Sequence, residues 1–480
     1  MRKWLPLVAI CLGAFILLVD VTIVNVALPR MADDLDASFS SLQWVIDIYA
    51  LALAALLLVS GSLADLFGHR RLYVAGLTVF ALASLACALS PNAAVLITAR
   101  AVQGVGGAAM FATSAALVAA TYKGRDRGVA FGVWGAVNGA AAAAGPIVGG
   151  LLTQGFGWQA IFLVNLPIAL VAVLLSLRAL PAGARAVSGV RLDLPGALTF
   201  TLAAAALTYA LIRGGDHGWT EGLALAAFAV AALSAAAFVV AELRSAQPML
   251  DLSLLRRPSF AGLLAGALLY QVAAFSGLVF ISLWLQNVLG LSPVRGGLAL
   301  MPLAGTAFLV AALAGRHMHR FAPRVPIGGG LLLIAAGCAL LWSTVHAGSG
   351  QSALFAGLAV TGVGVGLATP VLVSAAVDSV PPDRAGTAGG AVNTFRQLGM
   401  TLGIALFGAV FTARIRTATT SGATPHAAYA SAIDRISLYA AAAALAGALL
   451  VLTLVRTPRP APHAPAPDPA ADPIPVTAAR

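Results

Sequence analysis

The feature that most constrains this chain is its succession of long apolar stretches, each about 20 residues long and separated by short segments rich in charge, proline or glycine. A helix of that length spans the hydrocarbon core of a bilayer, and the stretches lack the alternation of a membrane β-strand. Of the 480 residues, 60% are hydrophobic and only 9% are charged. The sequence therefore predicts an all-α polytopic membrane protein.

The boundaries of the apolar stretches predict fourteen membrane-spanning helices. Proline, glycine and charged residues at the ends of each stretch set these limits. The predicted spans are 5–28, 42–64, 72–90, 93–121, 128–154, 160–179, 193–212, 222–243, 259–289, 295–315, 326–346, 352–377, 385–412 and 433–455.

The positive charges are distributed unevenly between the two sides of the predicted membrane. Most of the 28 Lys and Arg residues fall in alternate loops and tails of one side. Because such loops stay in the cytoplasm, both termini are expected to be cytoplasmic. The net charge of +11 is thus a topology signal, and no nucleic-acid partner is expected.

Short motifs recur in the same order in the two parts of the chain. The sequence Gly135-Ala136-Val137-Asn138 returns as Gly390-Ala391-Val392-Asn393. Such repeats indicate two six-helix bundles with a substrate site between them. The predicted division is a first bundle at 1–180, two extra helices with linkers at 181–258, a second bundle at 259–456 and a disordered Pro/Ala-rich tail at 457–480.

Three ionisable residues fall inside the first predicted spans. Asp20 and Arg100 each lie about 12 Å from the same side of the membrane, at 1.5 Å per residue, and Asp47 lies about 8 Å deep. A charged side chain at membrane depth costs about 2.5–3.5 kcal/mol or more, so each needs a reason to be there. Asp20 either binds and releases a proton or is a structural hydrogen-bonding residue, and Asp47 either joins it or is simply hydrated.

Other chemistries leave no signature in the sequence. The phosphate-binding pattern of ATPases and the common metallohydrolase and serine-hydrolase motifs are absent. No histidine falls deep in a span, and the three cysteines are far apart in sequence. We therefore expect no enzyme activity, no cofactor and no metal site.

Six motifs, in order and on matching helices, resemble the major facilitator superfamily, and within it the fourteen-helix drug:proton antiporters. The resemblance spans almost the whole chain. The motifs are Leu18–Pro29, Gly61–Arg71, Arg100–Gly104, Gly145–Gly150, Trp158–Pro167 and Phe395–Gly399.

The resemblance implies roles for several residues. It implies proton coupling for Arg100, for which a structural clamp between helices is the alternative. In the family, the loop after the second helix is a conformational latch, which implies that role for Gly61, Asp65, Gly68, Arg70 and Arg71. Leu66 and His69 replace the usual basic residues there, and an ordinary basic loop is the alternative. The antiporter motif maps onto Gly145, Pro146, Gly149 and Gly150. We expect Gly61 and Gly68 to form a tight turn, Pro146 to break its helix, and Gly149 and Gly150 to allow close contact between helices.

Polar and aromatic residues on the inner helices are candidates for the substrate cavity, although membrane helices also use such residues for packing. Arg396 lies too deep to reach the membrane surface and needs an acceptor, water or a substrate. The candidates are Asn25, Trp134, Asn138, Tyr270, Gln271, Phe275 and Arg396.

The sequence thus predicts a proton-coupled antiporter that exports small hydrophobic drugs or antibiotics by alternating access. Its expected partners are the substrate, protons and the bilayer, and the protein is expected to be a monomer. The alternatives are export of an endogenous metabolite or siderophore, proton symport, and a membrane sensor that transports nothing. The predicted span at 295–315 carries no carboxylate, which disfavours dicationic substrates.

Overall fold

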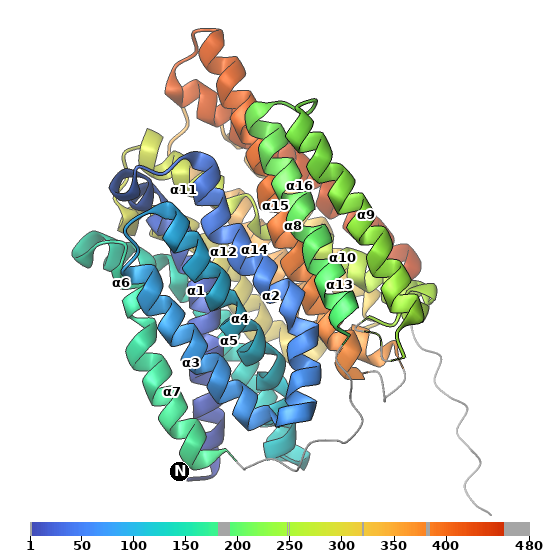
Figure 1. Cartoon of the computed structure of the whole chain (residues 1–480). Coiled ribbons are helices and arrows are strands. Elements are labelled where there is room, and N and C mark those ends of the chain that lie inside the picture. Colours follow the sequence, from blue (N-terminus) through green and yellow to red (C-terminus); the bar gives the residue numbers. More distant parts are fainter. Residues whose placement is uncertain are drawn as a thin grey trace, which may run out of the picture.

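The computed structural model describes residues 2–180, 193–246, 248, 250–318, 321–380 and 385–455. The described residues form helices and their connections, which confirms the all-α prediction (Figure 1). Thirteen of the described helices are long and apolar enough to cross a membrane. The remaining predicted span, 128–154, corresponds to α5, whose length is 33 residues. The predicted tail at 457–480 lies outside the described residues.

The helices before residue 180 pack into a first bundle (Figure 1). In it, α1 packs against α5 and α7, while α4 packs between α2 and α3. The bounds of these helices are α1 Leu5–Leu35, α2 Phe39–Phe67, α3 His69–Ala88, α4 Ala93–Thr121, α5 Gly124–Phe156, α6 Ala160–Leu163 and α7 Asn165–Ala179. The predicted span 160–179 is thus divided between α6 and α7.

The helices after residue 257 form a second bundle, in which α10 packs against α15 and α16, and α14 against α12 and α13. The predicted span 259–289 is divided into α10, α11 and a π-helical turn at Trp284–Val288. The bounds are α10 Pro258–Phe275, α11 Leu278–Leu283, α12 Pro293–Met318, α13 Arg324–Thr344, α14 Phe355–Asp378, α15 Ala385–Thr420 and α16 Pro425–Leu454.

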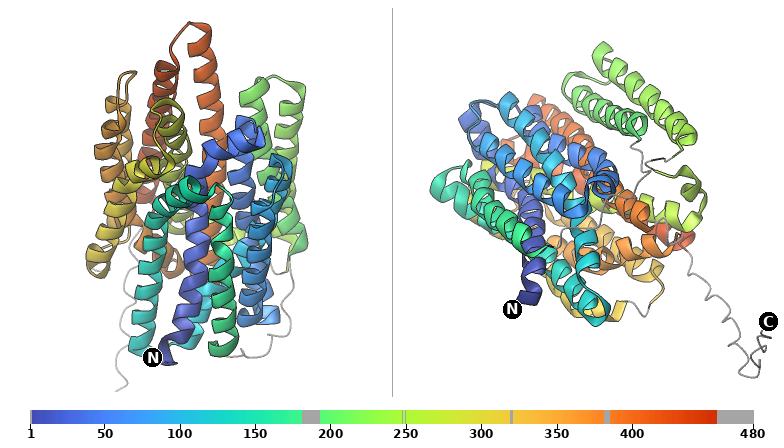
Figure 2. Two further views of the ribbon diagram at one scale, coloured as in Figure 1. Left: turned by 90° about the vertical axis from the view of Figure 1, so that its left-hand side faces the viewer. Right: turned by 60° about the horizontal axis from the view of Figure 1, so that its bottom comes forward.

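The two extra helices, α8 (Leu194–His217) and α9 (Gly222–Arg244), stand as a pair at the side of the bundles (Figure 2). Helix α8 contacts α15 and α2, and a Cβ on Gly215 would lie 2.6 Å from the Ala409 Cα atom. Arg213 and Glu221 join the two helices at 2.8 Å, and this hydrogen bond holds the pKa of the Glu221 carboxyl below its usual value.

Capping residues set several helix ends. The Ser38 hydroxyl accepts from the Ser41 N–H at 3.2 Å at the start of α2, and the Asn92 side chain accepts from the Val95 N–H at 3.0 Å at the start of α4. Gly68, with φ of 92°, ends α2 in a conformation that favours glycine. For orientation, we call the end where α1 begins and α2 ends proximal, and the end where α1 ends and α2 begins distal.

Two expectations from the sequence need correction, one about Gly61 and one about Pro146. Gly61 lies inside α2 rather than in the turn, which Gly68 forms alone. Pro146 does not break its helix, since α5 continues from Gly124 to Phe156. Membrane helices tolerate proline where neighbouring helices hold the segment, and Gly145 and Gly149 press α5 against Thr22 and Ile23 of α1.

The positions of Gly61 and Gly68 predict opposite effects of the same substitution. A Cβ on Gly61 meets nothing within 4 Å, so Gly61→Ala is expected to stabilise the protein by about 0.5–1 kcal/mol through helix propensity. Gly68→Ala is expected to destabilise it by about 1–2 kcal/mol because of the positive φ. The unfolding temperature of both variants is measured in detergent. A shift of the same sign in both would contradict the assignment of the turn to Gly68.

Candidate functional site

A buried ion pair joins α1 and α4 in the first bundle. The Arg100 guanidinium lies 2.5 Å from the Asp20 carboxylate, and the side chains are 1% and 0% exposed. The two residues are 80 positions apart in the chain, so helix packing brings them together. The sequence predicted only that both lie at a similar depth in the membrane, and the structure makes them direct partners.

Two more side chains donate to the Asp20 carboxylate, and a third is bonded to both of them. Gln103, one turn after Arg100, donates to it at 2.8 Å, and Asn165 at the start of α7 donates at 3.2 Å. The Ser84 hydroxyl of α3 accepts from Gln103 at 2.9 Å and from Asn165 at 3.3 Å. We call Asp20, Arg100, Gln103, Asn165 and Ser84 the buried polar network. It draws on α1, α3, α4 and α7, so a change at Asp20 reaches all four of these helices.

The guanidinium of Arg100 is also held from its other sides. Its Nε donates to the Val45 carbonyl oxygen of α2 at 3.0 Å, and its Cζ lies 4.1 Å from the centroid of the Tyr49 ring. A cation over an aromatic face is attracted by the ring, more so where water is excluded. Contacts with α2 therefore help to hold Arg100 in the first bundle, in addition to its bond to Asp20.

Gln103, Asn165 and Ser84 are residues of the site that sequence reasoning missed. Gln103 and Asn165 lie within the motifs Arg100–Gly104 and Trp158–Pro167, but the sequence assigned no role to either residue. The available signal was the helical spacing of Gln103 from Arg100, which places both on one face of α4.

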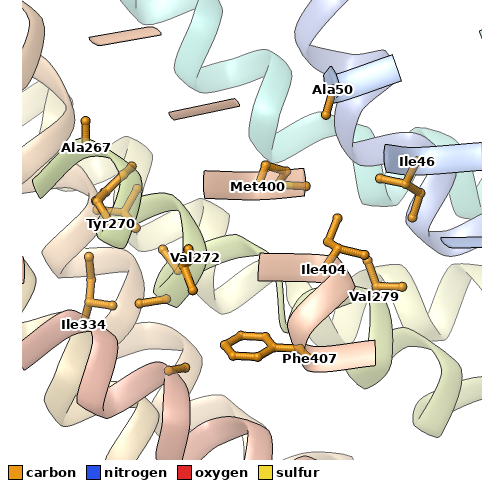
Figure 3. Close-up of a cluster of buried hydrophobic side chains, with 14 of the residues drawn as sticks. Ile46, Ala50, Ala267, Tyr270, Val272, Val279, Ile334, Met400, Ile404 and Phe407 are labelled. Carbon is orange, nitrogen blue, oxygen red and sulfur yellow. The ribbon is translucent and has the colours of Figure 1, made fainter. Parts of the chain in front are cut away.

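Asp47 does not join the buried polar network. It is 0% exposed, and neither carboxyl oxygen has a hydrogen-bond partner. The expectation that it is simply hydrated is wrong, because α2 packs against α15 on this side. Ile46 and Ala50, which flank Asp47 in α2, lie beside Ile404 and Met400 of α15 (Figure 3).

The two bundles meet through α2 and α15. The Gln43 side chain donates to the Ile404 carbonyl oxygen at 3.3 Å, and the Thr394 hydroxyl donates to the Ala54 carbonyl oxygen at 3.4 Å. These contacts lie in the distal and middle parts of α2.

The bundles also meet through α5 and α12, and through α1. A Cβ on Gly150 would lie 2.7 Å from the Pro293 carbonyl oxygen, and one on Gly297 would collide with the Pro146 carbonyl oxygen. Ser282 donates to the Asn25 carbonyl oxygen at 2.9 Å. These contacts lie toward the distal end of α5 and α1, so the described part of the chain is closed distally.

The predicted latch residues lie at the proximal end. Arg70 donates to the Leu177 carbonyl oxygen of α7 at 2.5 Å, whereas Arg71 is exposed. The Asp65 backbone belongs to the last turn of α2, but its side chain lies outside the described residues. The structure thus ties the start of α3 to α7, while the latch role of Asp65 stays a prediction.

The predicted cavity residues are spread over both bundles. Tyr270 and Gln271 are buried in α10, Phe275 stacks edge-on against Tyr270 at 5.9 Å, and Arg396 lies nearby on α15. Asn25 is buried, with no hydrogen-bond partner for its side-chain oxygen. Trp134 packs with the core of the first bundle, and the Asn138 side chain lies outside the described residues. The structure brings Tyr270, Phe275 and Arg396 together but does not place Asn25 with them.

Two helical bundles in contact, with a charged network buried in one of them, define a polytopic membrane protein with the architecture of a transporter. The chain belongs to the Major Facilitator Superfamily, whose model matches residues 10–404. It is 38% identical to Multidrug resistance protein Stp of Mycobacterium tuberculosis, over 85% of this chain and 76% of that protein.

A second relative and a solved structure agree with this assignment. The Methylenomycin A resistance protein of Streptomyces coelicolor is 36% identical over 84% of each chain. The structure of the human organic anion transporter MFSD10 superposes with a TM-score of 0.63 at 15% identity, covering 94% of this chain and 99% of that one. At 15% identity, the similarity to MFSD10 shows a shared fold only.

Proposed function

We propose that this protein exports small, largely apolar drugs or antibiotics in exchange for protons, by alternating access across the bacterial cytoplasmic membrane. The observation that carries the proposal is the Asp20–Arg100 pair, an ion pair buried at membrane depth inside the first bundle. Relatives named for multidrug and methylenomycin A resistance favour export of such compounds.

The proposed cycle uses the two states of Asp20. When Asp20 is ionised, it holds Arg100, Gln103 and Asn165 together. A proton on the carboxyl group removes its charge and one acceptor, so the buried polar network must rearrange. Because four helices share the network, rearrangement changes how the first bundle packs, and this change is the proposed link between the proton and the rocking of the bundles.

The uneven charge distribution supports the proposed orientation. With the proximal end in the cytoplasm, as the positive loops indicate, the closed distal end faces the outside of the cell. A proton entering from outside gains about 2.3 kcal/mol per 100 mV of membrane potential, and a pH gradient adds to it. This gain is the proposed driving force for export.

A susceptibility panel and a flux measurement together test the proposal. In a host that lacks its own exporters, expression is expected to raise the inhibitory concentration of at least one antibiotic, with methylenomycin A the first compound to try. In proteoliposomes, an imposed pH gradient is expected to drive that compound against its own gradient, and reversal of the pH gradient to reverse the flux. Flux of protons and compound in the same direction would instead indicate symport, and flux of neither would indicate a sensor.

A further inference from the structure

Arg396 is a membrane-embedded arginine whose surroundings differ from those of Arg100. It lies eight residues into the Ala388–Thr420 span, about 12 Å from the start of that span at 1.5 Å per residue. Within the described part of the chain, the ion pairs are Lys3–Asp126, Arg100–Asp20 and Arg213–Glu221. Arg396 is thus a cation in the membrane without a described carboxylate partner.

The contacts that Arg396 does make leave most of its hydrogen-bonding capacity unused. Its Nη1 lies 3.5 Å from the Asn393 side-chain oxygen, at the limit of a hydrogen bond, and its Nε is buried without an acceptor. A guanidinium has five N–H donors in a planar fork, which matches the two oxygens of a carboxylate. The group is only partly buried, so the fork remains open to a molecule outside the protein core.

The Tyr270 ring lies beside the Arg396 guanidinium, and a contact with α14 holds the ring in place. The Arg396 Cζ lies 5.7 Å from the centroid of the Tyr270 ring. The Tyr270 hydroxyl is 2.7 Å from the Thr369 hydroxyl, which itself donates to the Val365 carbonyl oxygen at 2.8 Å. Because α14 anchors the ring through Thr369, Tyr270 and the guanidinium form a preset platform between α10, α14 and α15.

The acidic residues described above do not pair with Arg396. Asp20 forms its ion pair with Arg100. Asp47 lies on α2, and no hydrogen bond or ion pair joins it to Arg396. The α12 helix, Pro293–Met318, contains no acidic residue. An isolated cation at membrane depth is costly and typically marks a ligand path.

We propose that Arg396 binds the anionic end of the exported molecule, so that the substrates are small, largely apolar organic acids carrying a carboxylate or a similar planar anion. Tyr270 acts as a positioning residue that orients the guanidinium. The apolar remainder of the substrate lies against the neighbouring side chains of α10, such as Phe275. This inference rests on the proposed function in one respect, namely that the bound molecule is the one transported.

The test is an equilibrium binding measurement, which requires no transport. The probes are dansylglycine, a fluorescent carboxylate, and its methyl ester, which has the same apolar part without the charge. Binding to the purified full-length protein is followed by energy transfer from tryptophan. The wild-type protein is expected to bind the acid about tenfold or more tightly than the ester, since a charge-assisted hydrogen bond is worth that much.

Three variants assign this preference to one side chain. Arg396→Gln is expected to weaken binding of dansylglycine about tenfold or more and to change binding of the ester less than twofold. Arg396→Lys keeps the positive charge but loses the planar set of N–H donors, so it should retain part of the preference for dansylglycine over its ester. Arg324→Gln is the matched control, because it removes an exposed arginine at the start of α13 and should leave both affinities unchanged.

The outcomes separate this proposal from the exporter proposal. Wild-type protein that binds the acid no more tightly than the ester, including no binding of either, overturns the anion site even if Arg396→Gln fails to fold. Equal losses for acid and ester in Arg396→Gln would show a packing role instead. A charge-selective site in a protein that fails the proton-flux test leaves the binding inference intact and rejects proton-coupled export.

Discussion

Asp20→Asn is expected to abolish proton-driven export while leaving the protein able to bind its substrate. The loss of one coupled proton removes about 2.3 kcal/mol of driving force per 100 mV, which corresponds to about a 50-fold concentration ratio. The measurement is uphill flux in proteoliposomes across an imposed pH gradient. A folded Asp20→Asn variant whose export keeps its pH dependence would show that the proton binds elsewhere.

The same substitution is expected to weaken the fold, because the Asn side chain cannot accept all the donors that Asp20 accepts. Breaking one partner of a buried ion pair typically costs about 3–5 kcal/mol. The double variant Asp20→Asn with Arg100→Gln removes both charges, so it should recover part of the lost stability. Its export should remain uncoupled, which separates the structural role of the pair from the role in coupling.

Asp47→Asn is the matched control within the same bundle. Asp47 is as buried as Asp20 but makes no hydrogen bond, so its replacement should lower thermal stability far less. If Asp47→Asn also abolishes coupling, the proton path includes α2. If it does not, the coupling role proposed for Asp47 is rejected while that of Asp20 stands.

Gly297→Ala is expected to hold the distal interface open. The Gly297 Cα faces the Pro146 carbonyl oxygen so closely that an added methyl group would collide with it. Both sides of this contact are helix backbone, which cannot turn away as a flexible side chain does. Overpacking typically costs about 1–3 kcal/mol, enough to shift a two-state equilibrium about 5- to 150-fold toward the distally open state.

The shift is measured as a distance between the bundles. Spin labels at Asp34 and Asn287, which are exposed near the distal end of each bundle, should move apart in Gly297→Ala. Transport should fall about tenfold or more, because one state is disfavoured. Gly305→Ala in the same helix is the control, since a Cβ there meets nothing within 4 Å. Equal distances in the two variants would show that the α5–α12 contact does not control closure.

Most of the helical architecture was predictable because membrane helices are encoded locally. A span is recognised from its own apolar residues, and its ends from caps and glycines such as Ser38 and Gly68. The departures have local causes too. Neighbouring helices hold the segment around Pro146, so α5 continues through a proline that would break an isolated helix.

The candidate site was predictable only in part. The depth of Asp20 and Arg100 in their spans placed them at one level, because the rise per residue of a helix is fixed. Depth does not specify which face of a helix a residue occupies against its neighbours. The sequence therefore did not show that Asp20 pairs with Arg100 of α4 whereas Asp47 makes no hydrogen bond.

The sequence by itself determined the membrane class, the helical spans and the identity of the ionisable residues inside the membrane, because hydropathy and charge act along the chain. The tertiary structure decided which of these residues are partners. It joined Asp20 to Arg100, Gln103 and Asn165, left Asp47 without a hydrogen bond, and left Arg396 without a described carboxylate. The reason is that pairing depends on helix rotation and packing between segments up to hundreds of residues apart, which no local pattern encodes.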